Sequence, residues 1–206
     1  MREKHKQAEK LAREHLLCAA NPGLIKQALL RLIVNHGLPL RTVEWPELHT
    51  LIYAINNQAD NVAWHHHQTT ARYVEKTFEA RQLELKQSLQ GAQSLVHLTT
   101  DTWHSPNLKE LQAITAHYVD SEGVLRKALL GILEMEDGHS GSEVAQQVIK
   151  KLDNYGIKER LGYITTDNHG ANDTLCVALS EQLEGWQPLQ RRLRCLGHII
   201  NLAVQS

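Results

Sequence analysis

Hydrophobic residues recur at helical spacing through the N-terminal part of the chain. Apolar positions separated by three or four residues predict amphipathic helices over residues 6–17 and 24–34, and Asn21-Pro22-Gly23 ends the first of these patterns. A further helix is expected to open at Pro46, and another to run over residues 69–90. These patterns predict a helical N-terminal region over residues 1–92.

The pattern changes from helical to strand-like after Ser94. β-Branched and apolar residues dominate 95–103, 111–119 and 124–135, and short turns rich in Ser, Pro, Asn, Asp and Gly separate these segments. Three strands joined by short turns are typical of an antiparallel meander.

Helical and strand patterns then alternate. Residues 140–143 fit a capping box at the start of a helix that Gly156 ends, and residues 161–166 form a fourth strand. A helix follows from His169 or Gly170. Because a helix between strands implies a crossover, the fourth strand should lie parallel to one already in the sheet. The order β-β-β-α-β-α predicts an α/β domain over residues 93–206, and another helix is expected from Gly197.

Two strands end in an acidic residue. Asp101 closes the first strand and Asp167 follows the fourth, and the first strand can be central with the fourth beside it. Two carboxylates brought together in this way repel each other, and a hard divalent cation such as Mg²⁺ or Mn²⁺ relieves the repulsion. The alternative is that a strand-terminal Asp caps a turn or the next helix, which applies most to Asp167.

The amino-acid composition limits the classes of protein and of binding partner that fit this sequence. The chain has 206 residues with 42% hydrophobic and 22% charged residues, values typical of a globular protein. A net charge of -1 gives no whole-chain attraction to nucleic acid, so a DNA-binding face has to be local, with Arg191, Arg192 and Arg194 as its candidates. We expect neither a signal peptide nor a membrane span.

Cysteine and histidine residues give weaker signals. The three cysteines are widely separated, which argues against a disulfide framework. Cys195 and His198 are three residues apart and could be a hydrogen-bonded structural pair, metal ligands or, least favoured, a hydrolase pair. His65, His66 and His67 are a weak metal signal and are expected to be a solvated polar run.

Three segments occur in a characteristic order: Thr-Thr-Asp-Thr-Trp at 99–103, Thr-Thr-Asp-Asn-His-Gly-Ala-Asn at 165–172 and Arg-Cys-Leu-Gly-His-Ile-Ile-Asn-Leu at 194–202. Together they resemble the core of hAT superfamily transposases, over about residues 38–206. The resemblance implies an RNase H-like fold, nuclear location, DNA as partner, and an acidic triad that binds two divalent metal ions for DNA cleavage and strand transfer. Asp101 matches the first catalytic Asp and Asp167 the second. Cys195 and His198 match the family's Cys-x-x-His element near the active site.

Departures from the family pattern shape the functional expectation. The family's third acidic residue is a Glu after a long helical insertion, which this sequence does not contain, and neither the C-terminal dimerisation region nor a BED-type zinc finger has a counterpart. We therefore expect a truncated transposase-like chain with an incomplete core, inactive by itself.

Two alternatives stay open. The first is a non-catalytic remnant that binds DNA through the three arginines, with Trp103 stacking on a base or packing in the core, or that binds a protein such as a full-length transposase. The second is an unrelated metal-dependent nuclease, if Asp173 or Glu134 completes the acidic site.

Overall fold

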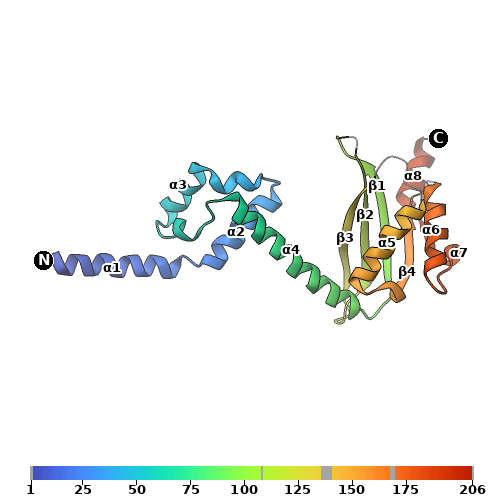
Figure 1. The fold of residues 1–206 in the computed structure, drawn as a ribbon, viewed down its shortest axis with the longest axis horizontal. Helices are drawn as coiled ribbons and strands as arrows, with labels where there is room; N and C mark the ends of the chain where they lie inside the picture. Colours follow the sequence, from blue (N-terminus) through green and yellow to red (C-terminus); the bar gives the residue numbers. More distant parts are fainter. Residues whose placement is uncertain (1, 108, 136–140, 168–169, 206) are drawn as a thin grey trace. The chain divides into compact units, whose positions relative to one another are not determined.

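The computed structural model describes residues 2–107, 109–135, 141–167 and 170–205. The chain divides into two compact units, Met1–Arg81 and Gln82–Ser206, with the division inside helix α4 (Figure 1). Each unit has a hydrophobic core of its own. No helix in the described part of the chain is both long enough and apolar enough to cross a membrane.

The N-terminal unit is helical, as the sequence predicts. Its elements are α1 (Arg2–Ala19), α2 (Pro22–Asn35), η1 (Leu40–Glu44), α3 (Pro46–Ile55), η2 (Asp60–Val62) and the first part of α4 (His67–Gln90). Local chemistry explains the boundaries. The side chain of Asn21 accepts hydrogen bonds from the backbone N–H groups of Gly23 and Leu24, and proline opens both α2 and α3.

The core of this unit is small. Its buried residues come from α2, η1 and the segment before α4, and they are Leu29, Ile33, Val43, Ala63 and Trp64. Tyr73 of α4 packs against Trp64, with ring centroids 4.8 Å apart. The elements of this unit therefore pack around few buried apolar side chains, and polar contacts help to hold them in place.

The C-terminal unit contains a mixed sheet. Within the described residues its strands are β1 (Val96–His104), β2 (Glu110–Val119), β3 (Leu125–Met135), β4 (Leu161–Thr166) and β5 (Arg192–Arg194), in the order β3-β2-β1-β4-β5. The β1, β2 and β3 pairs are antiparallel, and β4 lies parallel to β1. The central position of β1 and the parallel β4 confirm the predicted topology. The helical N-terminal region and the α/β core are confirmed as well.

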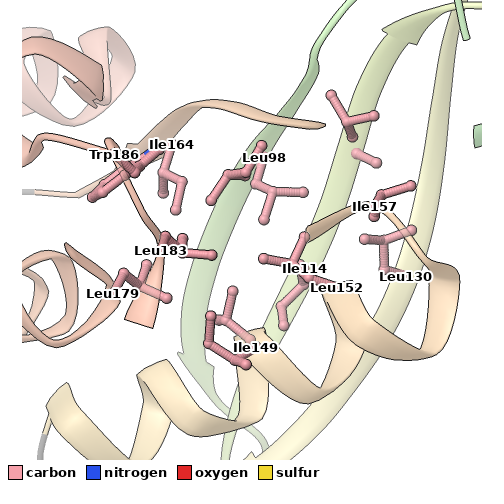
Figure 2. Packing of buried hydrophobic residues seen from close by; sticks show 14 of the residues in the cluster. Leu98, Ile114, Leu130, Ile149, Leu152, Ile157, Ile164, Leu179, Leu183 and Trp186 are labelled. Atoms are coloured by element: carbon pink, nitrogen blue, oxygen red, sulfur yellow. The ribbon is translucent and has the colours of Figure 1, made fainter. Parts of the chain in front are cut away.

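Helices α5 (Gly141–Tyr155) and α6 (Ala171–Gln182) pack against each other and cover one face of the sheet. Figure 2 shows Leu98 of β1, Ile114 of β2 and Ile164 of β4 pointing toward Leu152 and Ile149 of α5. The strand period of two turns the intervening residues to the opposite face. Ser140, the first residue of the expected capping box, lies outside the described residues.

Two further elements were not predicted as such. The short apolar run near residue 193 forms β5, which pairs parallel with β4, and α7 (Pro188–Arg191) precedes it. Helix α8 (Leu196–Gln205) follows directly. A three-residue strand has too little pattern for sequence periodicity to identify, and only its pairing with β4 defines it.

Candidate active site

Asp101 lies within β1, and Asp167 directly follows the last residue of β4, the parallel neighbour of β1. Thr99 of β1 is paired in register with Thr165 of β4, and each aspartate lies two residues further along its strand direction. Adjacent strands are about 4.8 Å apart, and residues two apart on a strand share a face. The register therefore brings Asp101 and Asp167 toward the same end of the two strands.

The surroundings of the two carboxylates differ. Asp101 is exposed, and none of the hydrogen bonds or ion pairs described for the chain involves its side chain. Asp167 is half-buried, and the side-chain amide of Asn172 donates to its Oδ1. The N-cap residue of α6 is Gly170, so Asp167 is not the N-cap of the helix that follows it.

This donor set suits a hard divalent cation. Carboxylate oxygens are the ligands that Mg²⁺ and Mn²⁺ prefer, and the exposed Asp101 carboxylate is accessible to an ion. Among the described residues, no group of three potential metal ligands includes either aspartate. The two carboxylates at this end of the sheet are therefore candidate ligands for such an ion.

Cys195 lies beside the same edge. Its backbone N–H donates to the carbonyl of Thr166 at 2.8 Å, which extends the β4–β5 pairing to the residue before Asp167. Cys195 and His198 are both half-buried. Within the described residues, neither belongs to a group of three potential metal ligands, so their role stays a prediction.

The three candidate DNA-binding arginines have different environments. Arg191 donates to the carbonyl of Leu161 at 3.0 Å. Arg192 is paired with Asp173, and its Nε donates to Thr166 Oγ1 at 3.2 Å. Burial, together with the nearby Arg194, lowers the pKa of Arg192. Arg194 is exposed on the last residue of β5, and so is the most accessible of the three to a phosphate backbone.

The structure also locates Trp103 and the two acids that could complete the site, Glu134 and Asp173. Trp103 is 38% exposed on the face of β1 that carries Asp101, and so is not a fully buried core residue. Glu134 is paired with Lys109 at 2.5 Å and lies on β3, two strands away from β1. Asp173 is paired with Arg192. Neither acid has a described contact with Asp101.

The open face of the sheet is hollowed next to the aspartates. A hollow of about 460 Å³ is lined by residues of β1, β2, β4 and β5, among them His97, Thr99, His117, Tyr163, Thr165 and Leu193. Burial, with a smaller contribution from Lys127, lowers the pKa of His117, whose Nε2 lies 3.1 Å from Thr99 Oγ1. The hollow is therefore lined by polar side chains such as Thr99 and Thr165 together with apolar surface.

Two features of the site could not be predicted from the sequence. They are the hydrogen bond from Asn172 to Asp167 and the structural contacts that Arg192 makes. Asn172 belongs to the segment 165–172 that carries the family resemblance, but only the fold brings its amide to Asp167. Arg192 resembles any surface arginine in sequence. Its partners Thr166 and Asp173 are remote along the chain, so no local pattern could have revealed them.

Residues 99–194, the segment that includes both aspartates, match the family model of the ZBED1 RNase-like domain. The chain is therefore similar to hAT-family transposase-like proteins. It is 29% identical to a candidate transcriptional regulator, tpeD, of Talaromyces stipitatus, over 87% of the chain and 22% of that protein.

Two plant proteins are similar as well. A candidate AC transposase of Zea mays is 26% identical over 67% of the chain and 18% of its own length. The zinc finger BED domain-containing protein DAYSLEEPER of Arabidopsis thaliana is 26% identical over 80% of the chain and 23% of its own length. The chain thus spans about a fifth of the length of these relatives.

Proposed function

We propose that the sheet edge at Asp101 and Asp167 is part of a divalent-metal-dependent centre for DNA strand cleavage and transfer. The observation that carries the proposal is the parallel register of β1 and β4, which brings Asp101 and Asp167 toward the same end of the two strands. The similarity to a protein named as an AC transposase supports the same chemistry. DNA is accordingly the proposed partner, and the nucleus the proposed location.

The roles of the residues follow from their contacts. Asp101 and Asp167 would hold Mg²⁺ or Mn²⁺, and Asn172 would orient the Asp167 carboxylate. A bound ion would supply Lewis-acid stabilisation of charge on a phosphodiester. Trp103 and Arg194, both exposed near this edge, would contact the nucleic acid.

We further propose that this chain does not cleave DNA by itself. A two-carboxylate site holds a divalent ion weakly, because hard cations need several charged oxygen ligands for tight binding. A further carboxylate, the acidic residue that the family resemblance implies, would complete the site.

Manganese binding tests the site directly. The whole chain would be titrated with Mn²⁺ and the free ion measured by electron paramagnetic resonance. We expect weak binding that Asp101→Asn and Asp167→Asn each abolish, while Glu134→Gln, an acid on the same face but paired with Lys109, leaves it unchanged. Binding that survives both aspartate changes would contradict the proposal.

Plasmid nicking tests the lack of activity. We expect that supercoiled plasmid is not converted to the nicked form in the presence of Mg²⁺ or Mn²⁺. Metal-dependent nicking that Asp101→Asn abolishes would show that the chain is itself an enzyme, and would overturn the proposal of inactivity while supporting the site.

The second candidate function is non-catalytic binding of DNA or of a protein. The observation in its favour is the similarity to tpeD, which is named as a candidate transcriptional regulator rather than a transposase. Exposed Arg194 would contribute phosphate contacts. Exposed apolar residues on β3, Leu129 and Ile132, would serve a protein partner such as a full-length transposase.

A DNA mobility shift distinguishes the two functions. Non-catalytic binding predicts a salt-sensitive shift that is retained in the Asp101→Asn/Asp167→Asn double variant and weakened by Arg194→Ala. A shift that requires Mn²⁺ and both aspartates would favour the catalytic function instead.

A further inference from the structure

A second cluster of potential metal ligands lies in the N-terminal unit, whose residues are not part of the site described above. It consists of His49 on α3, Asp60 at the start of η2 and His65 between η2 and α4, and we call it the His49 cluster. One donor atom from each residue lies within 4.8 Å of the others. His49 and Asp60 are half-buried, and His65 is exposed.

His49 is held at both ring nitrogens. Its Nε2 lies 2.7 Å from the carbonyl oxygen of Val43, and its Nδ1 lies 2.5 Å from Asp60 Oδ1. A neutral imidazole carries only one N–H, which the Val43 carbonyl requires. Nδ1 and the carboxylate are then two donors that face each other, and a bound cation would lie between them once they move apart to metal–ligand distances.

The bond to Val43 is the feature that metal-binding histidines commonly have. A ligating imidazole usually donates its other N–H to a carbonyl or carboxylate, which fixes the tautomer and the direction of the free lone pair. Val43 is completely buried, so this acceptor is fixed in the core. The Nδ1 lone pair is thereby directed toward Asp60.

His65 supplies the third donor. Its ring stacks on His49 with centroids 4.2 Å apart and 7° between the planes, and its Nε2 lies 2.8 Å from the backbone oxygen of Asp60. Two parallel rings cannot direct their in-plane lone pairs at one ion. Because His65 is exposed, its ring can turn out of the stack, and ion binding would replace the stack with coordination.

We propose that the His49 cluster is a Zn²⁺ site. The donors are His49 Nδ1, the Asp60 carboxylate and a ring nitrogen of His65, with water as the fourth ligand. Two imidazoles and one carboxylate suit Zn²⁺, whereas Mg²⁺ prefers oxygen ligands alone. The nearby Glu44 is not included, because its Oε1 already accepts from the ring and the backbone N–H of His67.

The site would stabilise the N-terminal unit. It joins α3, η2 and the segment that leads into α4, and these elements surround a core with few buried apolar residues. Units with small cores commonly depend on a metal ion or another cross-link. Zn²⁺ binding should therefore raise the midpoint of thermal unfolding of this unit.

The test uses the whole chain, purified without metal and titrated with Zn²⁺ against a chromophoric chelator that outcompetes weak surface histidines. We expect one Zn²⁺ per chain and an upward shift in the unfolding midpoint. His65→Ala should lower the affinity at least about tenfold, since even indirect supporting residues cost 10- to 100-fold. His66→Ala, at the exposed neighbouring position, is the matched control and should change neither quantity.

Co²⁺ substitution distinguishes this site from Cys195 and His198. The His49 cluster contains no thiolate, so bound Co²⁺ should show ligand-field absorption without a sulfur-to-cobalt charge-transfer band. A charge-transfer band lost in Cys195→Ser would assign the ion to the other pair and overturn the proposal. Failure to bind Zn²⁺, or binding unchanged by both His65→Ala and Asp60→Asn, would also overturn it, and a proton would then hold His49 to Asp60. None of these outcomes depends on Asp101 or Asp167.

Discussion

Asp101 lies two residues after Thr99, and Asp167 lies two residues after Thr165. These two threonines are in register on the parallel strands β1 and β4. This relationship ties the positions of Asp101 and of the strand that leads into Asp167 to backbone pairing. Sites built on strands hold their side chains with more precision than sites built on loops. The contacts of the α/β unit lead to four predictions that can be checked independently of cleavage.

Asn172 should tune metal binding at Asp167. Its side-chain amide donates to Asp167 Oδ1, so Asn172→Ala would leave the carboxylate less well oriented. We expect the Mn²⁺ affinity of the whole chain to fall by about tenfold, the scale of lost supporting hydrogen bonds at metal sites. Asn154→Ala, on the exposed side of α5, is the control. Equal affinities for the two variants would exclude an orienting role.

Arg192 should contribute more to stability than to DNA binding. Its side chain is only 13% exposed, and it donates to Thr166 Oγ1 and pairs with Asp173. Because charged hydrogen bonds are lost, Arg192→Ala should lower the free energy of unfolding by about 1.5–3 kcal/mol in urea denaturation. Exposed Arg194→Ala should stay within about 0.5 kcal/mol. Loss of DNA binding without loss of stability in Arg192→Ala would reverse this assignment.

Gly162 should not tolerate a side chain. A Cβ at this position would lie 2.6 Å from His97 Nδ1 and 3.1 Å from Leu95 Cβ. His97 cannot move freely, because its Nδ1 accepts from the backbone N–H of Tyr163. Gly162→Ala should therefore destabilise the sheet unit by about 1–3 kcal/mol, as overpacking does.

Gly170 is the matched glycine control. A Cβ there would meet no atom within 4 Å, and its φ of -60° suits alanine. Gly170→Ala should be neutral or slightly stabilising in the same thermal or urea unfolding experiment. Similar losses at both positions would show that the crowding at Gly162 does not determine the effect.

Asp120 should make the stability of the sheet unit depend on acid pH. The backbone N–H of Val124, the Arg126 guanidinium and the backbone N–H of Glu122 hold the pKa of Asp120 below its usual 3.8. A carboxyl whose pKa is lowered on folding stabilises the folded state above its unfolded pKa. This contribution should begin to fall near pH 4 and disappear below the folded pKa.

Asp120→Asn tests this pH dependence. The variant should be less stable than the parent at pH 7. Between about pH 5 and pH 2, the range in which ordinary carboxyl groups titrate, the stability of the variant should fall less than that of the parent. Glu122→Gln, at a largely exposed carboxylate, should follow the parent curve more closely. The measurement is urea unfolding across this pH range, and parallel curves for the parent and Asp120→Asn would contradict the assignment.

Local periodicity was sufficient to predict the longer helices and strands. Residues 95–103 alternate with a period of two, and residues 140–156 have apolar residues at helical spacing. Both patterns are visible in the sequence because β1 and α5 each bury one face. The parallel placement of β4 also followed, because a helix between strands permits few connections. From these features the pairing of Asp101 with Asp167 could be inferred.

The histidine run at residues 65–67 was interpreted less well. His66 is exposed, as expected for a solvated segment, but His65 stacks on His49 and His67 pairs with Glu44 at 2.6 Å. The partners lie well before the run in sequence. Adjacent histidines point in different directions, but His65 can share a metal ion with His49 and Asp60, which lie on other elements.

The sequence by itself determined the helical region and the arrangement of β1 to β4, because each depends on the periodicity of nearby residues or on the few topologies that short connections allow. Only the tertiary structure decided that Asn172 contacts Asp167, that Arg192 is paired with Asp173, and that His49, Asp60 and His65 meet. Polar side chains carry no periodic signature of their partners. Their contacts depend on how separately formed elements pack, and hydrogen bonds between them become worth forming only after the apolar faces have brought them out of water.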